Sequence, residues 1–267
     1  MSALYTKELK RNRRNFLIWT AIVIGFTVMV LSIYPFMEGM EEDLSNMMQN
    51  IPNELRKAMG MDDQTWGSIL GFYSTYFGIY IVLLAGIYTM STGATILSKE
   101  EKERTAEFLM TRPISRKSIF QSKMTALLTL TFGIIVLQTI VAAISFSIAS
   151  EDELAWTTFS TMHIHGAVLI FFFTCIGVLL SMFLNPKTNF MGIVFGVIFG
   201  SYFLDAMSKA TESTEWLGYF SAFHYVDFNL GNPDYSISIW GIVGLLVIGL
   251  LSVYYAFLRY NRRDIDD

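Results

Sequence analysis

The stretch SKEEKERTAEFLMTRPISRKSIFQSKM, residues 98–124, carries eleven charged side chains and lies between two of the most apolar segments of the chain. The whole sequence is 53% hydrophobic, 15% aromatic and only 16% charged, with a mean hydropathy of +0.45. A soluble domain is about 25% charged. The composition therefore indicates a protein embedded in a lipid bilayer, and residues 98–124 form a polar connector between two of its apolar segments.

The apolar stretches on both sides of this connector are long enough to cross a bilayer, which takes roughly 20 residues of helix. Six such stretches predict an all-α integral membrane protein that forms a single domain over residues 1–267. The predicted spans are residues 16–36, 68–97, 124–148, 161–184, 190–207 and 237–258. The second span is longer than a bilayer requires, which predicts tilt, an extension into the cytoplasm or a break near Gly78.

The positions of Lys and Arg predict the orientation, because cytoplasmic loops retain these residues. With the N-terminus inside, all of the 19 Lys and Arg residues except Arg56, Lys57 and Lys209 fall on the cytoplasmic side. We therefore expect both termini in the cytoplasm. The outer side then holds an amphipathic segment at residues 37–67 and an aromatic hairpin at residues 208–236, which packs on the membrane face or dips into it.

The basic run in residues 1–15 precedes the first span directly. It is either a plain anchor that keeps this end inside or an amphipathic helix on the inner membrane surface. Its basic residues are Lys7, Lys10, Arg11, Arg13 and Arg14.

The connector itself predicts two helices around a corner. Residues 99–109 favour a first helix, in which Glu100 and Arg104 have the spacing of a stabilising pair. Pro113 disfavours helical geometry at the residue before it, so the first helix ends there. Ser115 is a good N-cap for a second helix that runs into the third span.

The sequence lacks the residue patterns of an enzyme. It has no Gly-Lys pair of a phosphate-binding loop, no HExxH and no GxSxG, so we expect no catalytic residue, and any fuel must be hydrolysed by another subunit. The spans carry no ionisable side chain at mid-membrane, which disfavours an ion-driven transporter. Asp205 is interpreted as a solvated helix end and His224 as an interfacial polar tip. His163 and His165 have no further metal ligand nearby, so no metal site is expected.

The segment KERTAEFLMTRPISR resembles the signature of ABC-2 type permeases, in which a charged run, Thr, an acidic residue, an apolar triplet and Pro-Ile/Val-Ser-Arg follow the second span. The start KELKRNRR, the outer IPNELRKAMG, the FSAFHYVD before the last span and the closing YNRRDI extend the resemblance over the whole chain. Two positions depart from it. Arg104 stands where the family often has Gly, and Ala222 stands where Pro is common.

The resemblance implies the membrane subunit of a type V-like ABC exporter in a bacterial cell membrane. Two permeases, identical or related, would work with two copies of an ABC ATPase, which would bind the ATP and Mg²⁺. Residues 98–123 would contain the coupling helix that seats in the ATPase, and residues 1–15 would form the connecting helix beside it. The implied coupling residues are Lys99, Glu100, Glu101, Lys102, Glu103, Arg104, Thr105 and Glu107.

Small residues in the second and fifth spans predict close helix packing. Gly192, Gly196 and Gly200 recur every four residues, and Gly71, Gly78 and Ala85 every seven. Whether these seams face the same subunit, a partner or the cargo route stays open, and the crowded rings, among them Phe195 and Phe199, fit either the route or the lipid. A leucine is expected to disturb assembly more at Gly196 than at Gly241, which belongs to no four-residue repeat.

The expected function is ATP-driven export of an amphipathic or hydrophobic cargo, such as a peptide, an antibiotic or a lipid-like molecule, because the spans lack fixed charge. No nucleic acid partner is expected. Two alternatives are a membrane anchor or sensor that binds an ATPase without transporting anything, and a stand-alone channel.

Overall fold

The computed structural model describes residues 2–38, 51–52, 55–56, 68–102, 114–149, 155–185, 188–226, 228, 230 and 235–262. Within these ranges the chain forms helices and no strand, which confirms the all-α prediction. Six helical segments are long and apolar enough to cross a membrane, as expected from the hydrophobic pattern.

The six spans differ in how regularly they are built. The second is made of three consecutive segments, which are α5 (Ile69–Tyr76), the π-helix η1 (Phe77–Ile81) and α6 (Val82–Ile96). The other five are single helices: α1 (Ser2–Glu38), α9 (Arg116–Ala149), α10 (Trp156–Leu180), α11 (Phe190–Ala210) and α12 (Ile239–Arg262). The short helix α7 (Lys99–Lys102) follows α6, and the 3₁₀ segments η2 (Glu212–Phe220) and η3 (Phe223–Tyr225) follow α11.

Polar side chains begin several of these helices. The Ser115 hydroxyl oxygen accepts a hydrogen bond from the Ser118 amide at 3.2 Å, which confirms the predicted N-cap of α9. The Asn189 side chain caps α11 in the same way, through the Met191 amide at 3.1 Å. Such caps satisfy amides that have no partner inside the helix.

The break near Gly78, one of the three alternatives for this long span, does not occur: the π-helical turn η1 lies there, so the second span widens locally and continues. Gly78 lies against the ring of Phe228, and a Cβ atom there would come within 3.1 Å of that ring. π-helical turns inside α-helices occur frequently at functional sites.

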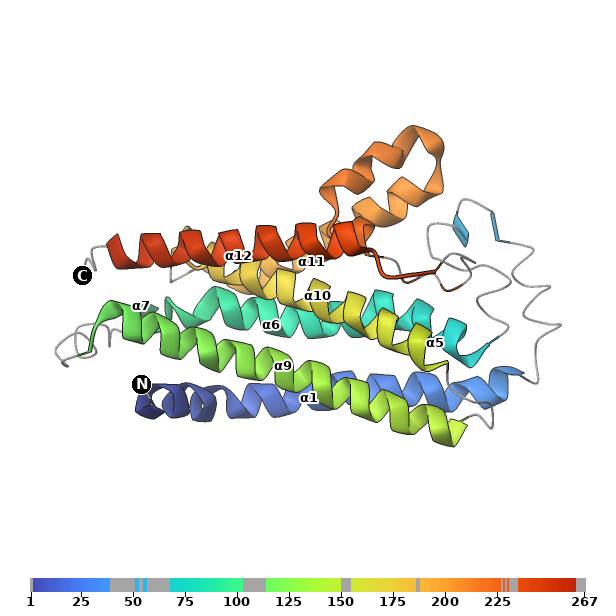
Figure 1. The fold of residues 1–267 in the computed structure, drawn as a ribbon, viewed down its shortest axis with the longest axis horizontal. Helices are drawn as coiled ribbons and strands as arrows, with labels where there is room; N and C mark the ends of the chain where they lie inside the picture. Colours follow the sequence, from blue (N-terminus) through green and yellow to red (C-terminus); the bar gives the residue numbers. More distant parts are fainter. Residues whose placement is uncertain are drawn as a thin grey trace.

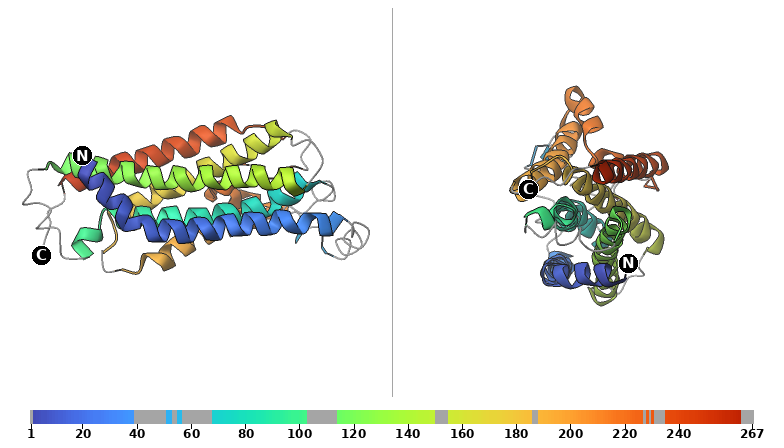
Figure 2. Two further views of the ribbon diagram at one scale, coloured as in Figure 1. Left: turned by 90° about the horizontal axis from the view of Figure 1, so that it is seen from below. Right: turned by 90° about the vertical axis from the view of Figure 1, so that its left-hand side faces the viewer.

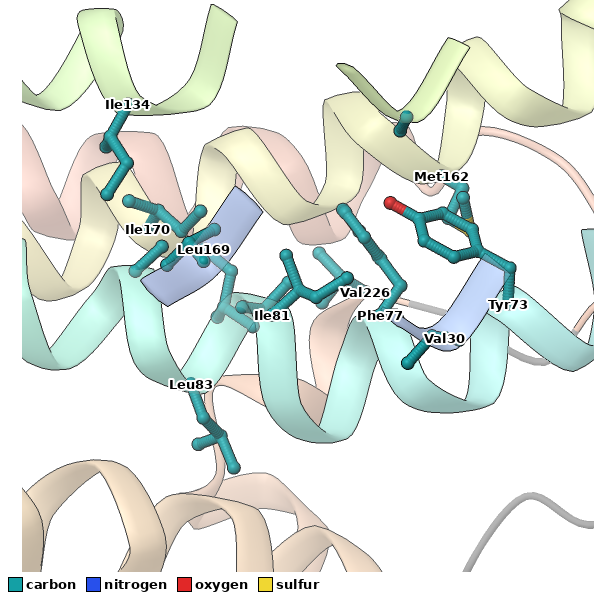
Figure 3. Packing of buried hydrophobic residues seen from close by; sticks show 14 of the residues in the cluster. Val30, Tyr73, Phe77, Ile81, Leu83, Ile134, Met162, Leu169, Ile170 and Val226 are labelled. Atoms are coloured by element: carbon teal, nitrogen blue, oxygen red, sulfur yellow. The ribbon is translucent and has the colours of Figure 1, made fainter. Parts of the chain in front are cut away.

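The second span and α10 form the centre of the bundle. Viewed end-on, α6 and α10 lie between the pair α1 and α9 on one side and the pair α11 and α12 on the other (Figure 2). The buried core follows this arrangement, and Figure 3 shows Tyr73, Phe77 and Ile81 of the second span close to Met162 and Ile170 of α10. The second span is therefore enclosed by other helices along most of its length.

Two glycines allow α6 and α10 to approach closely. A Cβ atom on Gly177 would lie 2.3 Å from the Met90 carbonyl oxygen, and one on Gly93 would lie 2.8 Å from the Thr174 carbonyl oxygen. No larger residue fits either position without moving backbone. This contact was not predicted, because neither glycine belongs to the two repeats identified in the sequence.

The segment after α11 folds back along that helix and forms a hairpin that projects from the bundle (Figure 1). The Ser221 hydroxyl donates to the Ser201 carbonyl oxygen at 2.7 Å, and the ring of Phe223 enters the core beside Phe173, 5.8 Å away between ring centroids. Trp216, Tyr219 and Phe220 of η2 remain exposed.

The beginning of α1, the end of α12 and the helix α7 all lie at one end of the bundle (Figure 1). We refer to this end as the α7 end. The first turns of α1 also bend away from the rest of that helix (Figure 2). Helix α7, the described part of the segment implied in coupling, therefore lies at the same end of the molecule as the basic N-terminal run.

Candidate functional site

A cluster of charged side chains joins three helices at the α7 end, and it is built around Lys123 of α9. Lys123 is fully buried, at 0% exposure. Its ammonium group donates to the carbonyl oxygen of Ile96, at the end of α6, and to the carboxylate of Glu100 in α7. One side chain of the third span thus holds both the last residue of α6 and the helix that follows it.

Two residues of α1 complete this cluster, which we call the ionic cluster: Glu8, Arg11, Glu100 and Lys123. A guanidinium nitrogen of Arg11 lies 3.2 Å from a carboxylate oxygen of Glu100 and 3.3 Å from one of Glu8. Lys123 lies 3.8 Å from the other carboxylate oxygen of Glu8. The cluster contains two positive and two negative side chains and is neutral as a whole.

The electrostatics of the cluster depend on this pairing. Burial alone would raise the pKa of Glu100, but the charge and hydrogen bond of Lys123 and the charge of Arg11 lower that pKa below its ordinary value of 4.5. Glu100 therefore remains ionised at neutral pH. Glu8 is 0% exposed, and within the described part of the chain its carboxylate makes ion pairs but no hydrogen bond. Removing either cation would leave a buried carboxylate poorly compensated.

The cluster fixes the position of α7 relative to two spans. A charge pair in a low-dielectric interior is strong while both partners stay in place and costly once they separate. The cluster therefore ties α7 to α1 through Arg11 and to α9 through Lys123.

The structure brings together only part of the residues implicated by the sequence. Glu100 and Arg11 meet in the ionic cluster, where Glu100 pairs with Arg11 of α1 and with Lys123 of α9. The other basic residues of the N-terminal run are exposed: Lys7, Lys10, Arg13 and Arg14. Lys99 is partly buried.

The remaining coupling residues fall outside what the structure describes. For two of them, within α7, only the backbone is described: Glu101 and Lys102. The other four lie outside the described residues: Glu103, Arg104, Thr105 and Glu107. The predicted pair of Glu100 with Arg104 therefore also lies outside them.

Sequence reasoning missed Lys123 and Glu8. In the sequence, Lys123 is one of many positive charges on the expected cytoplasmic side, and Glu8 is a lone acidic residue in a basic run. The available signal concerned Lys123 alone, which stands directly before the long apolar third span, where an ionised side chain needs a partner.

The glycine repeat of α11 faces away from the described part of its own subunit. A Cβ atom on Gly192, Gly196 or Gly200 would meet nothing within 4 Å among the described residues. Phe195 and Phe199 are also exposed on this helix, with their rings stacked at 5.8 Å. Tight packing inside the subunit does not explain this repeat.

The small residues of the second span lie inside the subunit. Gly71 and Ala85 are buried, and Gly78 packs on Phe228. The two seams that looked alike in the sequence therefore have different surroundings.

The expectation that Gly241 tolerates leucine better than Gly196 is wrong for packing within the subunit. A Cβ atom on Gly241 would lie 1.8 Å from the carbonyl oxygen of Tyr225. The hairpin after α11 passes directly over this turn of α12, which the sequence pattern did not reveal.

The hairpin explains both Ala222 and Asp205. The Ala222 amide donates to the Ser201 hydroxyl oxygen at 2.9 Å, a bond that proline cannot make. Asp205 is buried and accepts a hydrogen bond from Lys209 at 2.7 Å, so its interpretation as a solvated helix end is wrong. His224 is exposed, and its Nδ1 atom lies 3.9 Å from a carboxylate oxygen of Asp205.

In its described part, the chain has six helices long and apolar enough to cross a membrane, and its N- and C-termini lie at the same end of the bundle (Figure 1). These features define a multi-pass membrane protein. The family model described as ABC-2 family transporter protein matches residues 2–265, almost the whole chain. The chain therefore belongs to the ABC-2 transporter family and is a membrane transport subunit. Comparisons with curated proteins and with solved structures gave no match.

Proposed function

We propose that this chain is the permease subunit of an ATP-driven exporter, with the α7 end in the cytoplasm and a separate ABC ATPase docked there. The family membership and the excess of Lys and Arg at this end support the proposal. In this arrangement the ATPase binds ATP and Mg²⁺, and the permease binds neither.

The observation that carries the proposal is the ionic cluster. A soluble partner that pushes on α7 moves a helix whose Glu100 is tied to Lys123 of α9 and Arg11 of α1. A flexible connector would lose such a push, whereas a buried cluster passes it to two spans at once. The same contacts give the basic N-terminal run a role beside the coupling helix.

We further propose that two permeases form the working unit, either two copies of this chain or this chain with a related one. The open glycine face of α11 supports a helix–helix contact there, because small residues let two backbones approach closely in a membrane. A cyclic pair about an axis along the membrane normal would place two ATPases on the same side.

The cargo class follows from the polarity of the spans. Among the described residues, the ionisable side chains of the ionic cluster and of Asp205 lie towards the ends of their helices. A route without fixed charge suits an amphipathic or hydrophobic molecule, such as a peptide, an antibiotic or a lipid-like compound.

Purified complex in proteoliposomes tests the proposal against its alternatives. An exporter hydrolyses ATP faster when its cargo is present and moves that cargo only with ATP. An anchor or sensor binds the ATPase but shows no cargo-dependent hydrolysis. A stand-alone channel conducts without any ATPase.

A further inference from the structure

A second polar group lies inside the bundle, away from the α7 end, and it is the imidazole of His163 in α10. His163 is only 6% exposed, and its Nδ1 atom hydrogen-bonds the Phe159 carbonyl oxygen at 2.9 Å. A carbonyl oxygen only accepts, so Nδ1 is the donor and Nε2 of the neutral ring is an acceptor. Nε2 is buried and has no hydrogen-bond partner within the described part of the chain. It requires a donor that the described residues do not supply there.

The imidazole ring borders a small pocket between the second span, α9 and α10. The polar residues in its wall are His163, Gln138 and Thr139, and apolar side chains form the rest, among them Phe77 and Ile81 of the π-helical turn η1. The free volume is about 10 Å³, which is the room that one water molecule needs. The widened turn of η1 thus forms one wall of a space with polar atoms on the opposite sides.

Gln138 connects the pocket to the rest of the core. Its amide nitrogen donates to the Tyr73 hydroxyl oxygen at 2.7 Å, and that hydroxyl also interacts with Thr27 of α1. The amide oxygen of Gln138 is an acceptor by its chemistry. The hydrogen bond between Tyr73 of α5 and Gln138 of α9 therefore ends at the pocket that His163 borders.

We propose that this pocket is a binding site for one ordered water molecule that donates a hydrogen bond to Nε2 of His163 and bonds to Gln138 or Thr139. A buried water normally makes two to four such bonds, and the polar wall supplies them. A larger ligand does not fit in about 10 Å³. A metal ion needs several ligands, and the described residues contain no group of three His, Cys, Asp or Glu side chains that would hold one.

The bound water completes a polar link across four helices, through Thr27 of α1, Tyr73 of α5, Gln138 of α9 and His163 of α10. These residues lie within segments long and apolar enough to span a membrane. Without the water, the His163 acceptor has no partner in an apolar surrounding, which is unfavourable. The site also gives a reason for a histidine and a π-helical turn to occur side by side in an otherwise apolar core.

Hydroxyl-radical labelling tests the site, because X-rays generate radicals from bound water and these modify the nearest side chains. The purified full chain is irradiated in ¹⁸O-labelled water, and modification of Phe77 and Phe173 is compared by mass spectrometry. Both rings are almost fully buried, but only Phe77 borders the pocket. We expect Phe77 to be modified several times faster than Phe173. Equal rates for the two rings overturn the proposal.

Two histidine variants sharpen this comparison. His163→Phe removes the acceptor and should reduce the modification of Phe77 to the level of Phe173. His165→Phe is the matched control, because His165 is a buried histidine of the same helix whose Nε2 atom already accepts from the Ser238 amide at 3.2 Å. It should leave the rate at Phe77 unchanged. A folded His163→Phe variant that keeps the fast modification of Phe77 contradicts the site, and if that variant does not fold, the wild-type comparison still decides.

Discussion

Lys123 of α9 and Glu100 of α7 form an ion pair inside the protein, although 23 positions separate them along the chain. The pair connects α7, which lies in the segment that the ABC-2 resemblance implies and we propose as the ATPase contact, with the first turns of the next span. Arg11 and Glu8 bring α1 into the same contact. The proposed route of force transmission therefore consists of four named side chains, each of which is open to substitution.

Removing Lys123 should destabilise the folded chain strongly. Lys123→Met leaves Glu8 and Glu100 buried with Arg11 as their only described cation, and breaking a buried pair in this way costs about 3–5 kcal/mol. The double variant Lys123→Met/Glu100→Gln removes both charges of the pair and should recover much of the loss. The free energy of unfolding in detergent measures this, and additive effects of the two substitutions would mean that the residues do not interact.

The stability should also fall in acid through Glu100. Its folded-state pKa is lowered below 4.5, so its contribution is fully present above pH 4.5 and disappears as the pH falls through the lower folded-state value. Glu100→Gln should lose this part of the pH dependence and be less stable than the wild type at neutral pH. Unfolding curves recorded from neutral to acidic pH check the point. Identical slopes for both proteins below pH 4.5 would contradict it.

Alanine at Gly177 should destabilise the subunit, whereas alanine at Gly196 should not. The added methyl group at Gly177 would lie 2.3 Å from the Met90 carbonyl oxygen, but at Gly196 it would meet nothing within 4 Å among the described residues. Overpacking of this kind costs about 1–3 kcal/mol. The two variants are compared by thermal unfolding of the detergent-solubilised chain. A loss of stability at Gly196 as large as that at Gly177 would mean that the α11 glycines are packed within the subunit.

Leucine at Gly196 should weaken pairing of the permeases. Its side chain would stand on the open face of α11 and separate the two helices that we propose to meet there. Gly25→Leu is the matched control, because a Cβ atom on Gly25 would also meet nothing within 4 Å among the described residues, but this glycine lies on α1. Recovery of a second, differently tagged copy measures the pairing. Equal recovery for the two variants would remove α11 from the proposed contact.

The sequence predicted the six spans because long apolar runs need no partner to identify them. It also predicted the cap at Ser115, which is a local feature, and named a break near Gly78 as one of three alternatives, where the structure has the continuous π-helical turn η1. The ionic cluster was not predicted, because Glu8 and Lys123 lie far apart in the sequence and only the folded chain brings them together.

The same reasoning explains the errors at glycine and aspartate positions. A repeat shows that one face of α11 is small, but not what stands opposite that face. Gly241 lies under the backbone of Tyr225, and Asp205 is covered where the chain folds back along α11. Both surroundings depend on where the hairpin passes, and no local pattern of residues specifies that path.

The central claim, that the α7 end is where a separate ATPase docks, is tested most directly by the amount of ATPase that the purified chain retains. The tagged chain is co-expressed with candidate P-loop ATPases encoded by the genes beside its own, and the Glu101→Lys/Glu103→Lys variant is compared with Glu212→Lys/Glu215→Lys. The control makes the same charge change on exposed residues of η2, which Figure 1 places away from α7. We predict that the first variant loses the ATPase while the control keeps it. Equal retention by both variants would contradict the account.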